Sequence, residues 1–571
     1  MPDFVNAPIS VETNMIDGAV MNCAVRSLFT GGKLRIKRLG VVAIALAAVG
    51  ALTLSGCAGG AAEPAASGDA SAIVSTNGSE PQNPLIPTNT TETGGGKIVT
   101  SIFAGLVSYS AKGEIQKEVA ESIESTDATN WTVTLKDGWT FTNDEPVTAK
   151  SFVDAWNYGA LMSNAQSSSY FFDDIAGFSY DADSALTGLT VVDDKTFTVQ
   201  LASPEADWPL RLGYSAFSPL PEAAYADMDA FGENPIGNGP YMLKAEGAWE
   251  HNVAINLVTN PAYEGVRKPV NGGLDIVFYA SQDAAYADVQ GGNLDVLDAV
   301  PDSALQTYQS DFPDSYVNQP SAVFQAFNMP YYLEHWSGDE GKLRRAAISM
   351  SIDRKEITDV IFDGTRTPAT DFTSPVIDGY SDKLKGADVL EFNADKAKSL
   401  WAEADAISPY TGVFDIAYNA DGGHQAWVDA VVNSVKNTLG IDAVGKPYPT
   451  FAAALDDRTA GTLSGATRAG WQGDYPSLYN FLAPLYQTGA GSNYEGYSSP
   501  EFDALLKEGA AASSVEAATA KYQEAQEVLL KDLPTIPLWY SNVTGVWSAS
   551  TVDNVNFGWD GVPLYTEVTK G

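Results

Sequence analysis

One uncharged apolar run near the amino terminus sets the main limit on how this chain can fold. The run extends from Leu39 to Leu54, and four basic residues precede it: Lys33, Arg35, Lys37 and Arg38. It is shorter than the roughly 20 residues that a membrane-spanning helix needs. Its length and its basic flank are typical of the core of a signal peptide. We therefore expect residues 1–56 to direct export and the remaining chain to fold outside the cytoplasm.

The apolar run ends in Leu54-Ser55-Gly56-Cys57, which resembles the lipobox of bacterial lipoproteins. In that motif the chain is cut before the cysteine and the sulfur is acylated, and two or three acyl chains together give a stable membrane anchor. The other cysteine, Cys23, lies upstream of the cut, so the mature chain has no internal disulfide. Residues 57–72 are small and polar and predict a flexible tether. Residues 1–32 exceed what a signal peptide needs, and Met21 is an alternative start.

Length and charge limit the classes of protein that the secreted body can represent. The 571 residues are too many for one hydrophobic core, so we expect two or three lobes. The formal net charge is −39, from 33 basic and 72 acidic residues. Such a surface repels nucleic acid and anionic lipid headgroups, so we expect no nucleic-acid partner. The acidic surface serves solubility outside the cell.

Apolar periodicity predicts a mixed α/β protein without an internal repeat. Alternating or continuous apolar residues predict strands at 131–135, 196–201, 274–279, 414–418 and 536–540. Helical spacing predicts a helix at 149–160 with Thr148 as its cap, and further helices through 343–350, 427–435 and 518–529. Asp353 and Glu356 form a capping-box pattern that predicts another helix, with Ile357, Val360 and Ile361 facing inward. Periodicity alone does not order the strands.

Several segments in collinear order resemble the family 5 extracellular solute-binding proteins, the oligopeptide- and dipeptide-binding components of ABC importers. The most recognisable segment runs from Asp144 to Phe152. The others are 105–107, 119–122, 131–135, 235–243, 260–263, 343–346, 352–354 and 497–503. Each is weak by itself, but together they cover nearly the whole body.

The resemblance implies an α/β, periplasmic-binding-protein-like fold with two main lobes joined by a hinge and a smaller inserted third domain. Lobe I would comprise residues 73–111, 234–324 and 531–571, the inserted small lobe 112–233, and lobe II 325–530. Closure about the hinge would enclose the ligand. The implied function is to capture oligopeptides and deliver them to an ABC permease and its ATPase. We expect a monomer, lipid-anchored at the extracellular face of the cell membrane.

A peptide with free ends needs an anion for its ammonium group and a cation for its carboxylate, because an unpaired buried charge is costly. Arg468 and Asp474 offer both charges on one loop, which spans up to about 20 Å when extended. By resemblance, Asp474 pairs with the ligand ammonium, Arg468 with its carboxylate, and Trp471 packs beside the peptide. The alternative is a solvated loop with a surface ion pair.

Further matches to the family add five candidate ligand-binding residues. His424 opens a helix, whose amino terminus favours an anion, and matches a histidine that reaches the ligand carboxylate. A lone histidine can equally be a surface or satisfied residue. Arg458 matches a cleft arginine seven residues after an aromatic residue, here Phe451. Glu80 matches the strand whose backbone pairs with the ligand, as in strand addition, and Tyr170 contributes from the inserted lobe.

Other function classes find less support in the residues. The chain has only His251, His335 and His424, and it lacks Gly-x-Ser-x-Gly, His-Glu-x-x-His and a cysteine nucleophile after Cys57. We therefore expect no enzyme. The absence of clustered histidine or cysteine predicts no metal and no cofactor. The same scaffold could bind another solute such as an oligosaccharide, or act as a surface receptor or chaperone without transport.

Overall fold

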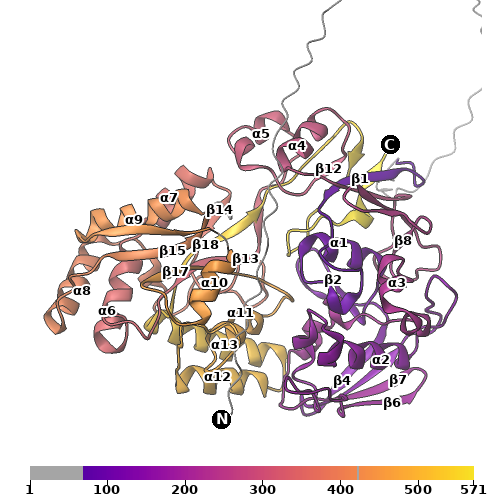
Figure 1. Ribbon diagram of the computed structural model, residues 1–571, viewed down its shortest axis with the longest axis horizontal. Coiled ribbons are helices and arrows are strands. Elements are labelled where there is room, and N and C mark those ends of the chain that lie inside the picture. The colour runs from indigo at the N-terminus through magenta and orange to yellow at the C-terminus, as the bar shows by residue number, and fades with distance from the viewer. Residues whose placement is uncertain (1–67, 421–423, 450) are drawn as a thin grey trace, which may run out of the picture. The chain divides into compact units, whose positions relative to one another are not determined.

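The computed structural model describes residues 68–420, 424–449 and 451–571 (Figure 1). The predicted signal peptide, Cys57 and most of the tether lie outside the described residues, as does the side chain of Phe451. In the described ranges, no helix is both long enough and apolar enough to cross a membrane.

A seven-stranded sheet is assembled from three separate stretches of the chain. Its order is β19-β12-β1-β11-β10-β8, with β9 paired to β10. The strands are β1 Ile73–Gly78, β8 Tyr241–Leu243, β9 Trp249–Glu250, β10 Ala254–Thr259, β11 Gly273–Phe278, β12 Val296–Leu297 and β19 Val546–Trp547. Strand β1 runs parallel to β11 and β12, whereas β10 is antiparallel to β11. The helices that accompany this sheet are α1 Thr93–Ile102, α3 Met228–Glu233, α4 Gln282–Gln290 and α5 Tyr308–Asp311.

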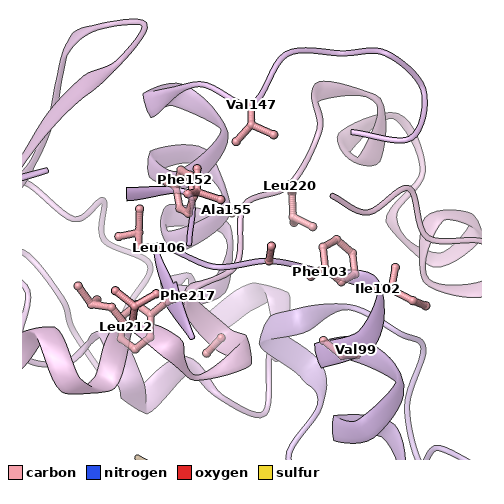
Figure 2. Packing of buried hydrophobic residues seen from close by; sticks show 14 of the residues in the cluster. Val99, Ile102, Phe103, Leu106, Val147, Phe152, Ala155, Leu212, Phe217 and Leu220 are labelled. Carbon is pink, nitrogen blue, oxygen red and sulfur yellow. The ribbon is translucent and has the colours of Figure 1, made fainter. Parts of the chain in front are cut away.

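The segment between β1 and β8 carries its own four-stranded antiparallel sheet, in the order β4-β5-β7-β6. These strands are β4 Ala120–Ser125, β5 Asn130–Leu135, β6 Leu189–Asp193 and β7 Thr196–Gln200. Helix α2 Ala149–Ala160 begins at a Thr148–Ser151 capping box and stacks Phe152 on Phe197 of β7. Figure 2 shows Phe152 and Ala155 in one cluster with Val99, Ile102 and Phe103, so the inserted sheet and α1 share one core. Two hairpin strands, β2 Val107–Tyr109 and β3 Ile115–Lys117, lie between them in sequence.

A six-stranded sheet with a separate core holds the remaining elements. Its order is β14-β18-β13-β17-β15-β16. The strands are β13 Gln319–Asn328, β14 Arg366–Pro368, β15 Phe414–Asn419, β16 Ala443–Tyr448, β17 Ala466–Gln472 and β18 Thr535–Val543. The helices are α6 Gly338–Met350, α7 Arg354–Phe362, α8 Ala394–Ile407, α9 Gln425–Leu439, α10 Phe451–Thr459, α11 Leu478–Tyr486, α12 Pro500–Ala510 and α13 Val515–Asp532. A short pair, β20 Val552–Asp553 and β21 Thr569–Lys570, lies near the carboxyl terminus.

Strand β18 corrects one predicted lobe boundary. Residues 531–571 were expected in lobe I, but β18 pairs with β13 and β14 and therefore belongs to the six-stranded sheet. The chain returns to the first sheet only at β19. Just outside the paired strands, the Val317 amide donates to the Gly545 carbonyl oxygen at 2.9 Å, and Tyr316 bridges Val546. The two segments that connect the sheets thus run side by side, as the expected hinge requires.

Helix α7 corrects a second expectation. Ile357 is buried, but Val360 is 69% exposed and Ile361 is 36% exposed. The helix buries the face that carries Arg354, Ile357 and Thr358, and Asp353 caps it as predicted by accepting from the Glu356 amide. The guanidinium of Arg354 donates to the carbonyl oxygens of residues in three other segments, Pro537, Ser349 and Leu390. These backbone acceptors allow a charged side chain to occupy the buried face in place of the predicted apolar ones.

Candidate functional site

A cavity of about 250 Å³ lies beside Asp474. Its lining comes from distant parts of the chain: the residues around the start of α1, Tyr109, the segment 213–215, the end of β17 and the turn after Phe557. The cavity therefore exists only once the first sheet, the inserted segment and the six-stranded sheet have come together. Asp474 therefore borders a cavity whose walls come from all three parts of the chain.

Asp474 is a half-buried carboxylate held in place by Asn480 of α11. The Asn480 side-chain amide donates to Asp474 Oδ2 at 3.0 Å, and its oxygen accepts from the Asp474 backbone amide at 2.9 Å. Burial raises the pKa of Asp474 to about 6, although the bond from Asn480 and the charge of Arg211 act in the opposite direction. Among the described residues, no cationic side chain forms an ion pair with it. A cation entering the cavity would therefore be favoured.

Asn480 is a site residue that no sequence motif indicated. It is 3% exposed, and the same side-chain oxygen that binds the Asp474 amide also accepts from the Trp471 indole at 3.1 Å. The Asn480 side-chain amide therefore connects Trp471 and Asp474 to α11. The sequence could have indicated Asn480 because it is the one polar amide in the stretch Leu478-Tyr479-Asn480-Phe481-Leu482. A polar side chain in such a stretch must hydrogen-bond to buried partners.

Three tyrosines surround the carboxylate. Burial raises the pKa of Tyr109, Tyr170 and Tyr214, and the negative charge of Asp474 contributes to each rise. Tyr109 and Tyr214 line the cavity. Tyr170, the predicted contact, lies in a 3₁₀ turn of the inserted segment and is 43% exposed. The structure therefore brings Tyr170 within the electrostatic reach of Asp474.

Arg468 lies on a strand rather than on the expected loop. Residues 466–472 form β17, in which Arg468 is paired with Phe327 of β13. Thr467 and Ala469 are buried, whereas Gly470 and Gln472 are exposed on the face that carries Arg468. The strand advances about 13 Å from Arg468 to its end at Gln472, since each residue advances about 3.3 Å, and Asp474 follows two residues later. Arg468 lines a different, much smaller cavity of about 10 Å³ than Asp474 does.

Arg458 lies beside Arg468 but is held by a carboxylate of the same chain. Its guanidinium contacts Glu495 through two hydrogen bonds of 2.5 and 3.0 Å, and it stacks 4.6 Å from the Tyr494 ring centroid. Both residues line the small cavity, and the pKa of Arg468 is lowered by burial and by the charge of Arg458. A ligand contact by Arg458 would compete with Glu495.

The side chains of His424 and Glu80 have local partners. His424 occupies the cap position of α9, where its Nδ1 accepts from the Trp427 indole at 3.1 Å. Glu80 accepts from His251 and from the Asn252 backbone amide, each at 2.7 Å. Neither His424 nor Glu80 lines the cavity beside Asp474.

Buried polar residues of the inserted segment contact the residues that follow Asp474, and no sequence motif indicated these contacts. Asp207 of the inserted segment accepts from the hydroxyls of Ser477 and Tyr522. Arg211 lies 5.4 Å from the ring centroid of Tyr475 and pairs with Asp174 at 2.5 Å. Sequence periodicity gave no signal for the contacts of Asp207 or for the contact of Arg211 with Tyr475, because these partners are more than 200 residues apart. They fix the segment that follows Asp474 against the inserted segment.

Comparisons with known proteins give matches over most of this chain. Residues 114–493 match the family model of bacterial extracellular solute-binding proteins, family 5, middle region. The chain is 28% identical over 541 residues to the periplasmic oligopeptide-binding protein OppA of Escherichia coli, covering 91% of this chain and 94% of the relative. It is 28% identical over 464 residues to the periplasmic murein peptide-binding protein MppA of the same species, covering 78% and 83%.

A solved structure gives the same fold. The unliganded open form of the periplasmic murein tripeptide-binding protein MppA matches with a TM-score of 0.74 at 23% identity, covering 88% of this chain and 99% of that one. The expected α/β, periplasmic-binding-protein-like fold is therefore confirmed.

Proposed function

Because the chain belongs to the bacterial extracellular solute-binding proteins of family 5, we propose that it captures peptides with free ends and delivers them to the permease of an ABC importer. OppA and MppA carry oligopeptide and murein peptide binding in their names. The proposal assigns a ligand of the same chemical class to this chain. The observation that carries it is Asp474, a half-buried carboxylate without an ion-pair partner among the described residues, at the wall of a cavity.

The ammonium group of the peptide pairs with Asp474. An ionised carboxylate in a poorly hydrated site is costly, and a hydrogen-bonded ammonium offsets much of that cost. Asn480 already fixes the carboxylate through Oδ2 at 3.0 Å, so little ordering remains to be done on binding. The charge of Asp474 acts on Tyr170, and Tyr170 contributes to the ammonium end of the site.

The carboxylate end of the peptide pairs with Arg468. The advance of about 13 Å from Arg468 to the end of β17 exceeds the backbone of a tripeptide, about 10 Å, so the long arginine side chain must reach toward a short ligand. At the carboxylate end of the peptide, Arg458 adds positive potential and His424 adds a hydrogen-bond donor. Trp471 packs along the peptide. The backbone near Glu80 pairs with the peptide main chain as an added strand, which satisfies it independently of its sequence.

Delivery requires a membrane-bound partner. We propose that the export signal is removed, that Cys57 is acylated, and that the monomeric protein is held at the outer face of the cell membrane near its permease. Lobe closure about the paired segments 316–319 and 543–546 would present the loaded protein to that permease. No catalytic step is part of this function.

Calorimetric titration of the purified protein with trialanine and with N-acetyl-trialanine tests the ammonium assignment. Free trialanine should bind at least about tenfold more tightly, because a buried charge-assisted hydrogen bond contributes roughly 1.5–3 kcal/mol. Asp474→Ala should abolish the difference, while Asp314→Ala, a change of an exposed carboxylate on a distant loop, should preserve it. Equal affinities for the free and acetylated peptides would show that Asp474 does not bind the ammonium. Native mass spectrometry of the same preparation would identify any ligand that co-purifies.

A further inference from the structure

The cavity beside Asp474 contains two more carboxylates that the proposed ammonium contact leaves unused. Glu92 precedes the first turn of α1, and Asp560 lies in the turn after Phe557. Both come from the lobe of the first sheet, whereas Asp474 follows β17 of the other sheet. The lining therefore presents negative charge from opposite walls.

One oxygen of Glu92 has an unmet hydrogen-bonding requirement. Oε1 caps α1 by accepting from the Gly95 amide at 3.1 Å and also accepts from the Gln82 amide at 3.2 Å. Oε2 is buried and has no hydrogen-bond partner among the described residues. The amino terminus of α1 favours a negative charge at this position. Glu92 therefore contributes to the lining a carboxylate with one oxygen that no donor among the described residues satisfies.

The one lysine in the lining does not neutralise these carboxylates. Lys97 of α1 forms a buried ion pair with Asp298, which lies outside the lining. Burial lowers the pKa of Lys97 to about 8, and Asp560 opposes that shift. Asp298 already balances this cation, so Glu92, Asp474 and Asp560 give the cavity an excess of negative charge.

The remaining wall suits a long side chain that carries positive charge. Tyr109, Tyr214 and Trp559 line the cavity, and Tyr109 packs edge-on against Trp559 at 5.6 Å between ring centroids. Aromatic faces attract ammonium and guanidinium groups and cover their aliphatic stems. The volume of about 250 Å³ lies below the roughly 300–1,000 Å³ of a site for a whole small ligand. The cavity therefore has room for one residue of a peptide.

We propose that this cavity is the subsite for the amino-terminal residue of the peptide and that it selects lysine or arginine there. This inference rests on the proposed function, since Asp474 must hold the adjacent ammonium. The basic side chain lies along the aromatic rings, and its terminal N–H groups pair with the carboxylates of Glu92 and Asp560.

The test compares Lys-Ala-Ala with norleucine-Ala-Ala by calorimetric titration. Norleucine keeps the four-carbon chain and lacks the charge. The purified protein should bind the lysine peptide at least about tenfold more tightly. Glu92→Gln keeps a cap acceptor for α1 and should reduce this ratio to below about threefold. Asp560→Asn provides an independent variant with the same expectation, and the exposed Glu124→Gln on β4 should keep the full ratio.

The two affinities separate failure of this inference from failure of the proposed function. A ratio near one in the unchanged protein, with both peptides binding, would overturn the basic subsite and leave peptide capture intact. A ratio that persists in both Glu92→Gln and Asp560→Asn would also overturn it, because the charge would then be recognised elsewhere. If neither peptide bound, the proposed function itself would fall, and the subsite with it.

Discussion

The unliganded protein should become more stable at neutral pH when Asp474 is replaced by asparagine. Burial raises the pKa of this carboxyl from 3.8 to about 6. One pKa unit corresponds to about 1.4 kcal/mol, so the ionised group costs the folded state roughly 1–3 kcal/mol once its partial solvent contact is allowed for. Asparagine has nearly the same shape, keeps an oxygen to accept from Asn480, and carries no charge to desolvate.

The sign of the pH dependence follows from the same pKa. Because the pKa of Asp474 is higher in the folded state than in the unfolded state, the folded protein binds the proton more tightly. The penalty is absent below about pH 4, grows as the pH rises through about 6, and is complete above about pH 7. The stabilisation by Asp474→Asn should therefore be visible at about pH 8 and vanish at about pH 4.

Thermal unfolding measured across this pH range checks the prediction. With an unfolding entropy of about 2.1 cal/mol/K per residue, a change of 1 kcal/mol shifts the Tm of a body of this size by about 1 °C, so the variant should melt about 1–3 °C higher at pH 8. Asp314→Asn, which changes an exposed carboxylate, should show no such pH-dependent difference. If the Tm difference between Asp474→Asn and the unchanged protein were the same at both ends of the range, desolvation of Asp474 would be refuted.

Three other expectations follow from the site. Peptide affinity should fall up to about tenfold per pH unit below pH 6, because a protonated Asp474 cannot pair with an ammonium. Calorimetric titration at several pH values checks this, and an affinity that does not change with pH contradicts it. Asn480→Ala should move the midpoint of that pH profile upward, since the bond from Asn480 lowers the pKa of Asp474; an unchanged midpoint would exclude this coupling. Glu495→Gln should lower the free energy of unfolding measured in urea by about 3–5 kcal/mol, because Arg458 then lacks the carboxylate that pairs with it. Glu495→Gln combined with Arg458→Met should recover part of this lost stability.

Local sequence patterns determined many elements of this fold. The helix predicted at 149–160 is α2 with the same bounds, and the strand predicted at 131–135 is β5 extended by one residue. These predictions succeed because periodicity and capping depend on neighbouring residues. The resemblance to family 5 was also available from sequence, since collinear motifs require no coordinates. It led to Asp474 and Tyr170, which lie close enough to interact electrostatically.

Only the tertiary structure decided the partners of these residues. No spacing rule indicated that β18 would belong to the six-stranded sheet and not to lobe I. Nor did any rule indicate that Arg354 would lie on the buried face of α7 where apolar residues were expected. Glu92 and Asp560 are about as far apart in sequence as the body allows, so only the folded chain brings them to one cavity with Asp474. The sequence determined which charges and elements the chain contains. The packing of distant segments decided which charges are paired, which are buried alone, and therefore which can recognise a ligand.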